Sequence, residues 1–117
     1  MLFISRLIDK LYVRICVYRG LTIGKDVYCG RNVRFDSRAC SLISIGDNST
    51  LSNDVYILAH DACTKLHLGY TQVAKVSIGK RTFLGARTIV LPGVSIGDNV
   101  IIGAGSIVTS SIPDNVV

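Results

Sequence analysis

Apolar side chains recur at every sixth position through most of the chain, and this period is the strongest pattern in the sequence. Two breaks in the register divide the six-residue units into runs of three, three and six. The first positions of these units are Ile23, Cys29, Phe35, Ile45, Leu51, Ile57, Ile78, Leu84, Val90, Ile96, Ile102 and Val108. Because only 49% of the residues are hydrophobic, such a set would arise by chance on the order of once in several thousand sequences.

The other positions of the unit predict a solenoid of short strands. Position 2 is Gly in seven of the twelve units, and position 5 is small or β-branched in eleven, the last being Ile112 and the exception Asp61. Positions 1 and 5 would point inward, and Gly-Asp-Asn in Ile45–Asn48 would tolerate the turn between units. Three units would close one triangular coil, and the coils would stack by hydrogen bonding. We expect four coils, at 23–40, 45–62, 78–95 and 96–113, in one domain that spans 21–117 with an insertion at 41–44 and an extended loop at 62–77.

The first twenty residues follow a different pattern. They contain no Gly before Gly20, and Arg6, Lys10 and Arg14 place a basic residue every four positions among apolar ones. This spacing predicts an amphipathic helix over 1–20. Its apolar face could pack on the body or on a partner subunit, or the helix could lie on a membrane surface as a peripheral contact. No run of 18 or more apolar residues exists, so we expect no membrane-spanning helix.

Charge and cysteine content narrow the class of protein. The net charge is +5, but Lys and Arg are scattered and not interleaved with the few aromatic residues, so a nucleic-acid partner is not expected. A mild positive field suits a small anionic ligand, a nucleotide-containing substrate or an anionic membrane. The four Cys show no CxxC spacing, and the start of the chain does not resemble a signal peptide. We therefore expect reduced cysteines and a cytoplasmic protein, at the inner face of the membrane if the helix binds there.

The segment Ile78–Asn115, IGKRTFLGARTIVLPGVSIGDNVIIGAGSIVTSSIPDN, resembles the C-terminal signature of the hexapeptide acetyltransferases. That group includes the maltose, galactoside and serine acetyltransferases and the sugar O-acetyltransferases of capsule and colanic-acid pathways. The resemblance covers residues 21–117. It implies an all-β fold, a left-handed parallel β-helix preceded here by the short α-helix, and a homotrimer with active sites between subunits. It also implies direct transfer of an acetyl group from acetyl-CoA to a sugar hydroxyl, in surface-polysaccharide biosynthesis.

The resemblance implies that His60 is the general base. The family's catalytic His lies just before the extended loop, often in a His-Asp pair, and Tyr56–Asp61 (YILAHD) matches that place. A hydroxyl is a poor nucleophile that must lose its proton as it attacks a thioester, and neutral imidazole suits this task. His60 also precedes Asp61, where the position-5 rule fails, and a break in a regular scaffold is a candidate site. A solvent-exposed or packing role is the alternative.

Three further residues are expected to bind the acceptor: Asp36, Asp61 and His67. Asp36 stands where many units have Gly, and family members place an Asn or Asp near there that touches the acceptor or the base. A surface turn is the alternative for Asp36. Asp61 could instead orient an imidazole, and His67 could simply belong to a mobile loop. Zinc needs three or four convergent ligands, and the chain has only two histidines, so no metal is expected despite the nearby Cys63.

In the family, small residues line the tunnel for CoA, and backbone groups pair with its pantetheine arm. The matching positions here, expected to bind acetyl-CoA, are Phe83, Gly85, Ala86, Arg87, Ala104 and Gly105. Lys80 and Arg81 could also meet the CoA phosphates. The alternative is that these small residues serve only the turns of the repeat.

The sequence departs from the family pattern at three places. Phe83 stands where many relatives have Trp, and Ser110-Ser111 where they have Lys-Asp. Relatives also continue past the IPDN segment with a tail that helps to close the cofactor site, whereas this chain stops at Val117. These departures leave open a truncated chain or a catalytically impaired trimeric scaffold. Independently of them, an acetyltransferase for serine or another amine is a further alternative.

Overall fold

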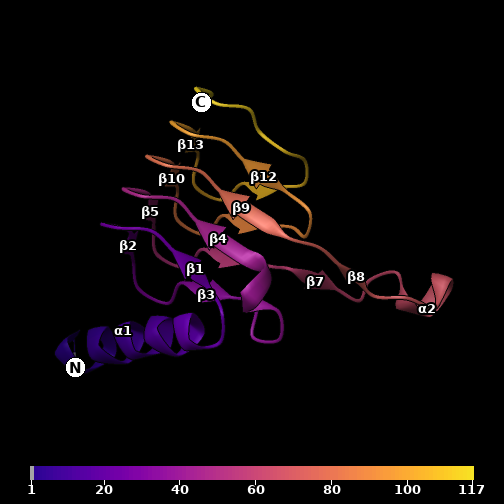
Figure 1. Ribbon diagram of the computed structural model, residues 1–117, viewed down its shortest axis with the longest axis horizontal. Helices are drawn as coiled ribbons and strands as arrows, with labels where there is room; N and C mark the ends of the chain where they lie inside the picture. Colours follow the sequence, from indigo (N-terminus) through magenta and orange to yellow (C-terminus); the bar gives the residue numbers. More distant parts are fainter. Residues whose placement is uncertain (1) are drawn as a thin grey trace.

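The computed structural model describes residues 2–117, in which one N-terminal helix of 17 residues precedes a stack of short parallel strands (Figure 1). Met1, the first residue of the helix expected at 1–20, lies outside the described residues. The helix α1 covers Leu2–Tyr18. The strands of the stack are β1 (Thr22–Ile23), β2 (Tyr28–Cys29), β3 (Arg34–Phe35), β4 (Ile43–Ile45), β5 (Thr50–Leu51), β6 (Tyr56–Ile57), β9 (Val76–Ile78), β10 (Phe83–Leu84), β11 (Ile89–Val90), β12 (Ser95–Ile96), β13 (Ile101–Ile102) and β14 (Ile107–Val108).

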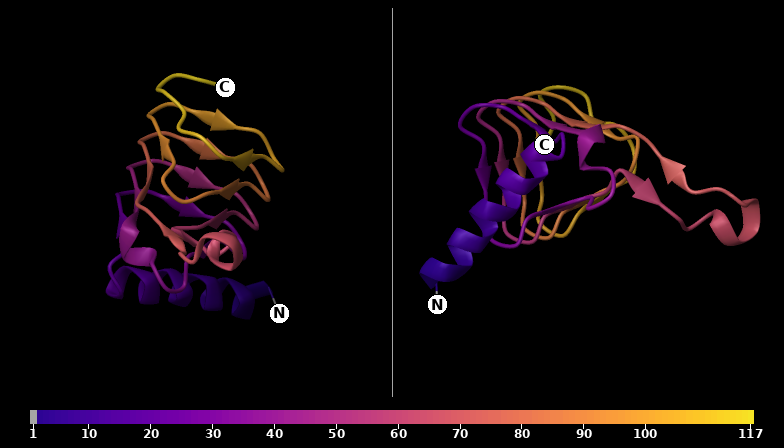
Figure 2. Two further views of the ribbon diagram at one scale, coloured as in Figure 1. Left: turned by 90° about the vertical axis from the view of Figure 1, so that its right-hand side faces the viewer. Right: turned by 60° about the horizontal axis from the view of Figure 1, so that its bottom comes forward.

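These strands form the three sides of a parallel β-helix (Figure 2). Each side is a four-stranded sheet, with one strand from each coil: side 1 is β1-β4-β9-β12, side 2 is β2-β5-β10-β13, and side 3 is β3-β6-β11-β14. The register follows the six-residue units, since Ile45 lies opposite both Ile23 and Ile78. The predicted all-β solenoid of four coils with a short N-terminal helix is thus confirmed.

The interior is filled by the first and fifth positions of the units. Ten of the twelve first-position side chains are buried, and Ile23 and Cys29 are partly buried in the first coil. Fifth-position hydroxyls point into the same interior and donate to backbone carbonyls: Ser49 Oγ to Gly79 O at 2.7 Å, and Thr82 Oγ1 to Gly97 O at 2.8 Å. Buried polar groups are tolerated when they are paired in this way.

The turn residue of the unit is the fourth position, not the Gly at the second. Asn48 and Asn99 adopt left-handed backbone with φ of 58° and 55°, a region that Asn tolerates better than most residues. Gly46 instead lies where successive coils approach closely: a Cβ there would stand 2.6 Å from the carbonyl carbon of Gly79 and 2.7 Å from the backbone nitrogen of Lys80. The IGDN turns therefore need Gly for contact between coils and Asn for backbone conformation.

Replacing Gly46 by Ala is expected to lower the free energy of unfolding by about 2 kcal/mol or more, because the new methyl group meets only backbone, which cannot rotate aside. Gly103→Ala is the matched control, since a Cβ at this second position would meet nothing closer than Ser106 Oγ at 3.9 Å. That control should change stability by less than about 0.5 kcal/mol. Denaturant titration of both variants checks the prediction, and equal losses would contradict it.

The last coil is two residues shorter than the sequence pattern predicts. Hydrogen bonds between stacked turns show the difference directly: Lys80 N donates to Asp98 Oδ1, eighteen residues on, whereas Asp98 N donates to Asp114 Oδ1, sixteen residues on. Ile112 accordingly pairs with Ile96 and takes a first-position place in the stack. The expectation of a full coil at 96–113, with Ile112 at a fifth position, is therefore wrong.

Two segments leave the regular path between coils. A 3-10 helix, η1 (Cys40–Leu42), rounds the corner between the first and second coils. Between the second and third coils the chain forms an arm of two antiparallel strands, β7 (His60–Asp61) and β8 (Gln72–Val73), with the short helix α2 (Lys65–Leu68) at its tip. The arm projects far from the stack (Figure 1). It begins at His60, two residues before the extended loop expected at 62–77.

The helix α1 lies across the N-terminal end of the stack (Figure 2). Tyr12 fixes it there, because its hydroxyl donates to Phe35 O and accepts from Phe35 N, both at 2.9 Å. Phe35 belongs to the first coil, so these backbone groups have no neighbouring strand to pair with. Burial raises the pKa of Tyr12 to about 12. No helix within residues 2–117 is both long and apolar enough to cross a bilayer.

Candidate active site

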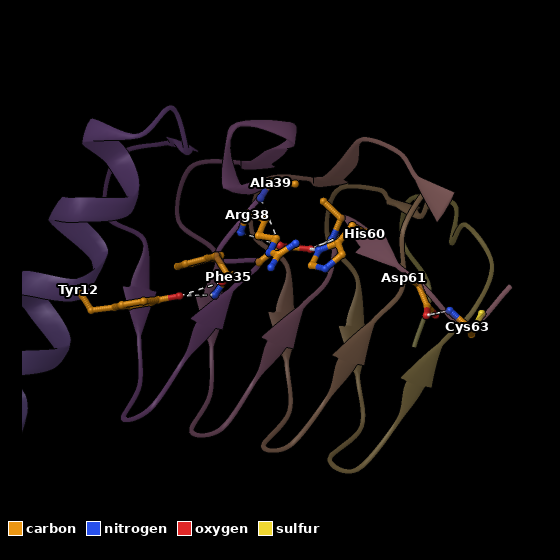
Figure 3. A network of polar contacts seen from close by, with 9 residues as sticks. Tyr12, Phe35, Arg38, Ala39, His60, Asp61 and Cys63 are labelled. Carbon is orange, nitrogen blue, oxygen red and sulfur yellow. Dashed lines mark hydrogen bonds and ion pairs between the residues drawn. The ribbon is translucent and has the colours of Figure 1, made fainter. Parts of the chain in front are cut away.

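The base of the arm holds a close contact between Asp36 and His60, which are 24 residues apart in sequence. Asp36 follows β3 and His60 begins β7, directly after β6. Strands β3 and β6 are neighbours on side 3, with Phe35 opposite Ile57. Because the first two coils stack on each other, Asp36 at the end of β3 lies beside the point after β6 where the chain leaves the second coil. His60 lies near Arg38 and Ala39 in Figure 3.

The Asp36 carboxylate is surrounded by N–H groups. Oδ1 accepts from the backbone nitrogens of Arg38 at 3.0 Å and Ala39 at 3.2 Å. Oδ2 accepts from the backbone nitrogens of Ala59 at 3.0 Å and His60 at 2.8 Å, and also contacts Nδ1 of the His60 imidazole. The chain leaves the coil at Ala59 and His60, so these amides lack the regular sheet partner and Asp36 replaces it.

These contacts lower the pKa of Asp36 and determine the tautomer of a neutral His60 ring. Burial alone raises the pKa of Asp36, but the hydrogen bonds from the Arg38 amide, the His60 imidazole and the Ala59 and His60 amides outweigh it and hold that pKa below its usual value. The ionised carboxylate only accepts hydrogen bonds, so the proton of a neutral His60 ring must sit on Nδ1. The lone pair of Nε2 is then left to accept a proton from another molecule.

Exposure differs sharply between the two residues. The Asp36 side chain has 0% relative exposure, whereas that of His60 has 33%. With its oxygens occupied by five donors, Asp36 offers no free atom to an acceptor sugar in this structure. Its geometry suits contact with the base, the other role that the family resemblance implied. His60 can be approached from solvent.

The remaining candidates from the arm do not join this pair. Asp61 Oδ1 accepts from the backbone nitrogen of Cys63 at 2.9 Å and so caps the turn that follows β7 (Figure 3). His67 is exposed on α2, at the far end of the arm. Within residues 2–117, no group of three or more His, Cys, Asp or Glu side chains is placed to hold a metal ion.

The candidates for binding acetyl-CoA gather at another corner, between sides 2 and 3. The turn after β10 holds Gly85, Ala86 and Arg87, and the turn after β13 holds Ala104 and Gly105. The two turns stack directly, because Gly105 N donates to Ala86 O at 2.8 Å and a Cβ on Gly85 would stand 2.5 Å from Ala104 N.

The remaining donor-binding candidates flank that corner. Phe83 is 43% exposed on the outer surface of β10. The Arg87 guanidinium lies 4.0 Å from an oxygen of Asp54 and is largely exposed.

Within one chain, the histidine and this corner are separated by the width of side 3. His60 follows β6 at one end of the side-3 strands, and Gly85 and Ala104 precede β11 and β14 at the other. Two surface hollows, of about 500 and 300 Å³, lie beneath α1 and at the open end of the last coil, and residues other than His60 line them. A single chain thus offers a base and a separate platform of small residues.

Sequence reasoning identified Asp36 and His60, and the family resemblance offered contact with the base as one of two roles for Asp36 without deciding between them. A signal was present: alignment of stacked units places Asp36 level with Leu58, two residues before His60. Asp36 also replaces the Gly common at the second position, and His60 occupies the fourth position, where nine of the other eleven units carry a residue with positive φ. Two irregular positions in units stacked on each other mark this site.

Comparison with known proteins agrees with the architecture. The family model for the hexapeptide repeat of succinyl-transferase matches residues 20–59 and 75–110. A solved maltose O-acetyltransferase from Clostridium difficile 630 superposes with a TM-score of 0.63 at 28% identity, covering 98% of this chain and 81% of that one. The left-handed form of the parallel β-helix, expected from the sequence, is confirmed by these matches.

Two curated relatives are galactoside O-acetyltransferases. The one from Lactococcus lactis is 40% identical over 92 residues, which cover 79% of this chain and 38% of the relative. The one from Escherichia coli K12 is 35% identical over 101 residues, covering 80% of this chain and 50% of the relative. The chain therefore spans half or less of the length of these two enzymes.

Proposed function

The chain belongs to the hexapeptide-repeat family of transferases, and from that premise we propose that it transfers an acetyl group from acetyl-CoA to a sugar hydroxyl. The observation that carries the proposal is the contact between His60 Nδ1 and the buried Asp36 carboxylate. The names of the galactoside and maltose O-acetyltransferases support acetyl as the group transferred and a sugar as the class of acceptor. Surface-polysaccharide biosynthesis and a cytoplasmic location stay predictions.

His60 acts as the general base in this mechanism. Its Nε2 accepts the proton of the sugar hydroxyl as the hydroxyl oxygen attacks the thioester carbonyl. The tetrahedral intermediate then collapses, the carbon–sulfur bond breaks, and the proton passes from Nε2 to the CoA thiolate. Asp36 holds the ring in the tautomer that leaves Nε2 basic and stabilises the positive charge that the ring gains. Asp36 is thus a positioning residue for His60 and not an acceptor-binding one.

The small-residue corner is the proposed place of the donor. The pantetheine arm carries amides that can pair with exposed backbone groups of the Ala86 and Ala104 turns, and a backbone N–H there can stabilise the oxyanion. Gly85 and Gly105 leave space for the pantetheine chain and Phe83 lines that space, and Arg87 offers positive charge to the CoA phosphates. Asp61 and His67 are retained as proposed acceptor contacts from the arm.

We place the complete site between two copies of the chain, in a homotrimer. The separation of His60 from the donor corner within one chain supports this arrangement. The outer surfaces of the three sides support it too. Side 1 carries only hydroxyls, whereas side 2 exposes Phe83 and Ile101, and side 3 exposes Tyr56 and Ile107. Two apolar sides that meet at the donor corner are suited to packing against neighbouring copies.

The trimer predicts a mass in solution of about three times 12.6 kDa. Ile107→Glu should shift the protein to a monomer and abolish turnover, because Ile107 is 62% exposed on side 3 and a buried unpaired charge is costly. Thr22→Glu is the matched control, because it adds the same charge on side 1, whose outward residues are hydroxyls. It should leave the mass unchanged. Light scattering after size exclusion measures both, and a monomeric wild type would contradict the arrangement.

Thiol release from acetyl-CoA tests the activity itself. We expect release that depends on a sugar acceptor, across a panel of galactosides, maltose and other hexoses. Release that depends on serine or an amino sugar instead would identify an amine or serine acetyltransferase. Failure to bind CoA in calorimetry, by a chain of normal fold, would leave the scaffold alternative.

A further inference from the structure

The helix α1 exposes a broad apolar surface on the side turned away from the β-helix. Tyr12 and Cys16 face the first coil. Six large apolar side chains outside this contact are between 45% and 90% exposed, and at 100° per residue they form one continuous stripe from the outward side to the flank, where Ile8 lines the hollow beneath α1. They are Ile4, Leu7, Ile8, Leu11, Ile15 and Tyr18. Single exposed apolar residues are ordinary, but a contiguous stripe marks an interaction surface.

A row of cations runs beside this stripe. Arg6, Lys10 and Arg14 are exposed and follow one another at four-residue spacing. Asp9 is the only acidic residue among the first twenty, and it pairs with Arg34 of the first coil at 3.7 Å. The outward side of α1 therefore combines apolar area with positive charge that no carboxylate of the helix offsets.

The position of α1 makes this surface accessible. The helix lies across one end of the stack, and its outward side forms the end of the molecule (Figure 2). The bonds between the Tyr12 hydroxyl and the Phe35 backbone, and the Arg34 guanidinium carbon 4.5 Å from the centre of the Tyr12 ring, hold the helix in this orientation. The β-helix thus presents the stripe as a fixed surface.

We propose that α1 binds the surface of an anionic phospholipid bilayer and lies in its plane. The apolar stripe enters the boundary between headgroups and acyl chains, and Arg6, Lys10 and Arg14 contact lipid phosphates. Charge decides between the possible occupants. The occupant must bring both apolar volume and negative charge; a second α1 brings the same cations, whereas anionic lipid supplies both.

Flotation of the full chain with vesicles tests the proposal. The wild type should float with phosphatidylcholine vesicles that contain phosphatidylglycerol, much less with phosphatidylcholine alone, and less as salt is raised. Lys10→Gln/Arg14→Gln should weaken binding by roughly thirtyfold, the loss expected from two basic side chains at an anionic surface. Leu7→Ser/Leu11→Ser should weaken it by roughly tenfold or more, because two half-exposed leucines no longer enter the lipid.

Matched controls separate this surface from nonspecific adsorption. Lys65→Gln/Lys75→Gln removes the same charge from exposed sites outside α1, and Leu66→Ser/Leu68→Ser removes leucines that are more exposed than Leu7 and Leu11 from the arm. Both should bind vesicles as the wild type does. Equal losses in the controls, or no binding of the wild type, would overturn the proposal. The proposal would also be overturned if Leu7→Ser/Leu11→Ser changed the mass in solution but not the flotation. That result would assign α1 to contact between copies of the chain.

Discussion

His60→Ala is expected to lower kcat for acetyl transfer by about 10²–10⁴-fold, the range that a positioned general base contributes. The variant keeps the backbone N–H that donates to Asp36 Oδ2, and His60 is one-third exposed, so the fold should survive. What disappears is Nε2, the only ring nitrogen that Asp36 leaves available for the sugar proton. The measurement is thiol release under saturating acetyl-CoA and acceptor, with KM determined for both.

The affinity for CoA separates a lost base from a damaged site. Because the proposed donor contacts come from the small-residue corner and Arg87, and none is assigned to His60, binding of CoA by calorimetry should stay within about threefold of the wild type in His60→Ala, a change of less than about 1 kcal/mol. Unchanged kcat in a variant that binds CoA normally would remove His60 from the mechanism.

Asp36→Asn is expected to lower kcat by about 10²-fold or more and also to destabilise the protein by about 2–4 kcal/mol. The carboxylate accepts from backbone donors on both of its oxygens. An amide has one oxygen and one NH2 group, so one pair of backbone donors would face another donor. If the NH2 faces Nδ1, the imidazole also loses the partner that fixes its tautomer.

The pH dependence of stability distinguishes loss of this charge from general damage. The pKa of Asp36 is lower in the folded chain than the unfolded value of about 3.9. Its stabilising effect is therefore fully present above that value and is lost as pH falls through the lower folded pKa. The gap in unfolding free energy between wild type and Asp36→Asn should narrow on acidification. A gap that is constant down to the acid transition would contradict the role assigned to the carboxylate.

Positioning and binding roles of Asp36 differ in the kinetic constants. A residue that acts through His60 should change kcat far more than the KM for the sugar, since it touches no substrate atom. Asp36→Asn measured below its unfolding temperature should show this split. A raised KM with unchanged kcat would return Asp36 to the acceptor-binding role.

Much of the fold could be predicted because the sequence repeats its pattern of apolar residues every six positions. A bulky residue at each first position must point inward wherever the chain coils, so Leu51, Ile57 and Leu84 identify the core without knowledge of their neighbours. The same regularity made its interruption visible in the sequence. The fifth-position rule fails at Asp61, next to His60, where the chain leaves the coil. The small residues of the proposed donor corner were instead indicated by the resemblance to the hexapeptide acetyltransferases, because the turns of the repeat need small residues in any case.

The tertiary structure decided what depends on one coil lying upon another. The contact of Asp36 with His60 exists because β3 and β6 stack in register just where the second coil opens into the arm. The separate duties of Gly46 and Asn48, and the shortened last coil at Ile112, are likewise set by the adjacent coil. A six-residue period fixes which side of the chain is buried, because that choice is local. It does not fix which polar groups meet, because that follows from the spacing between coils and from where the chain leaves them.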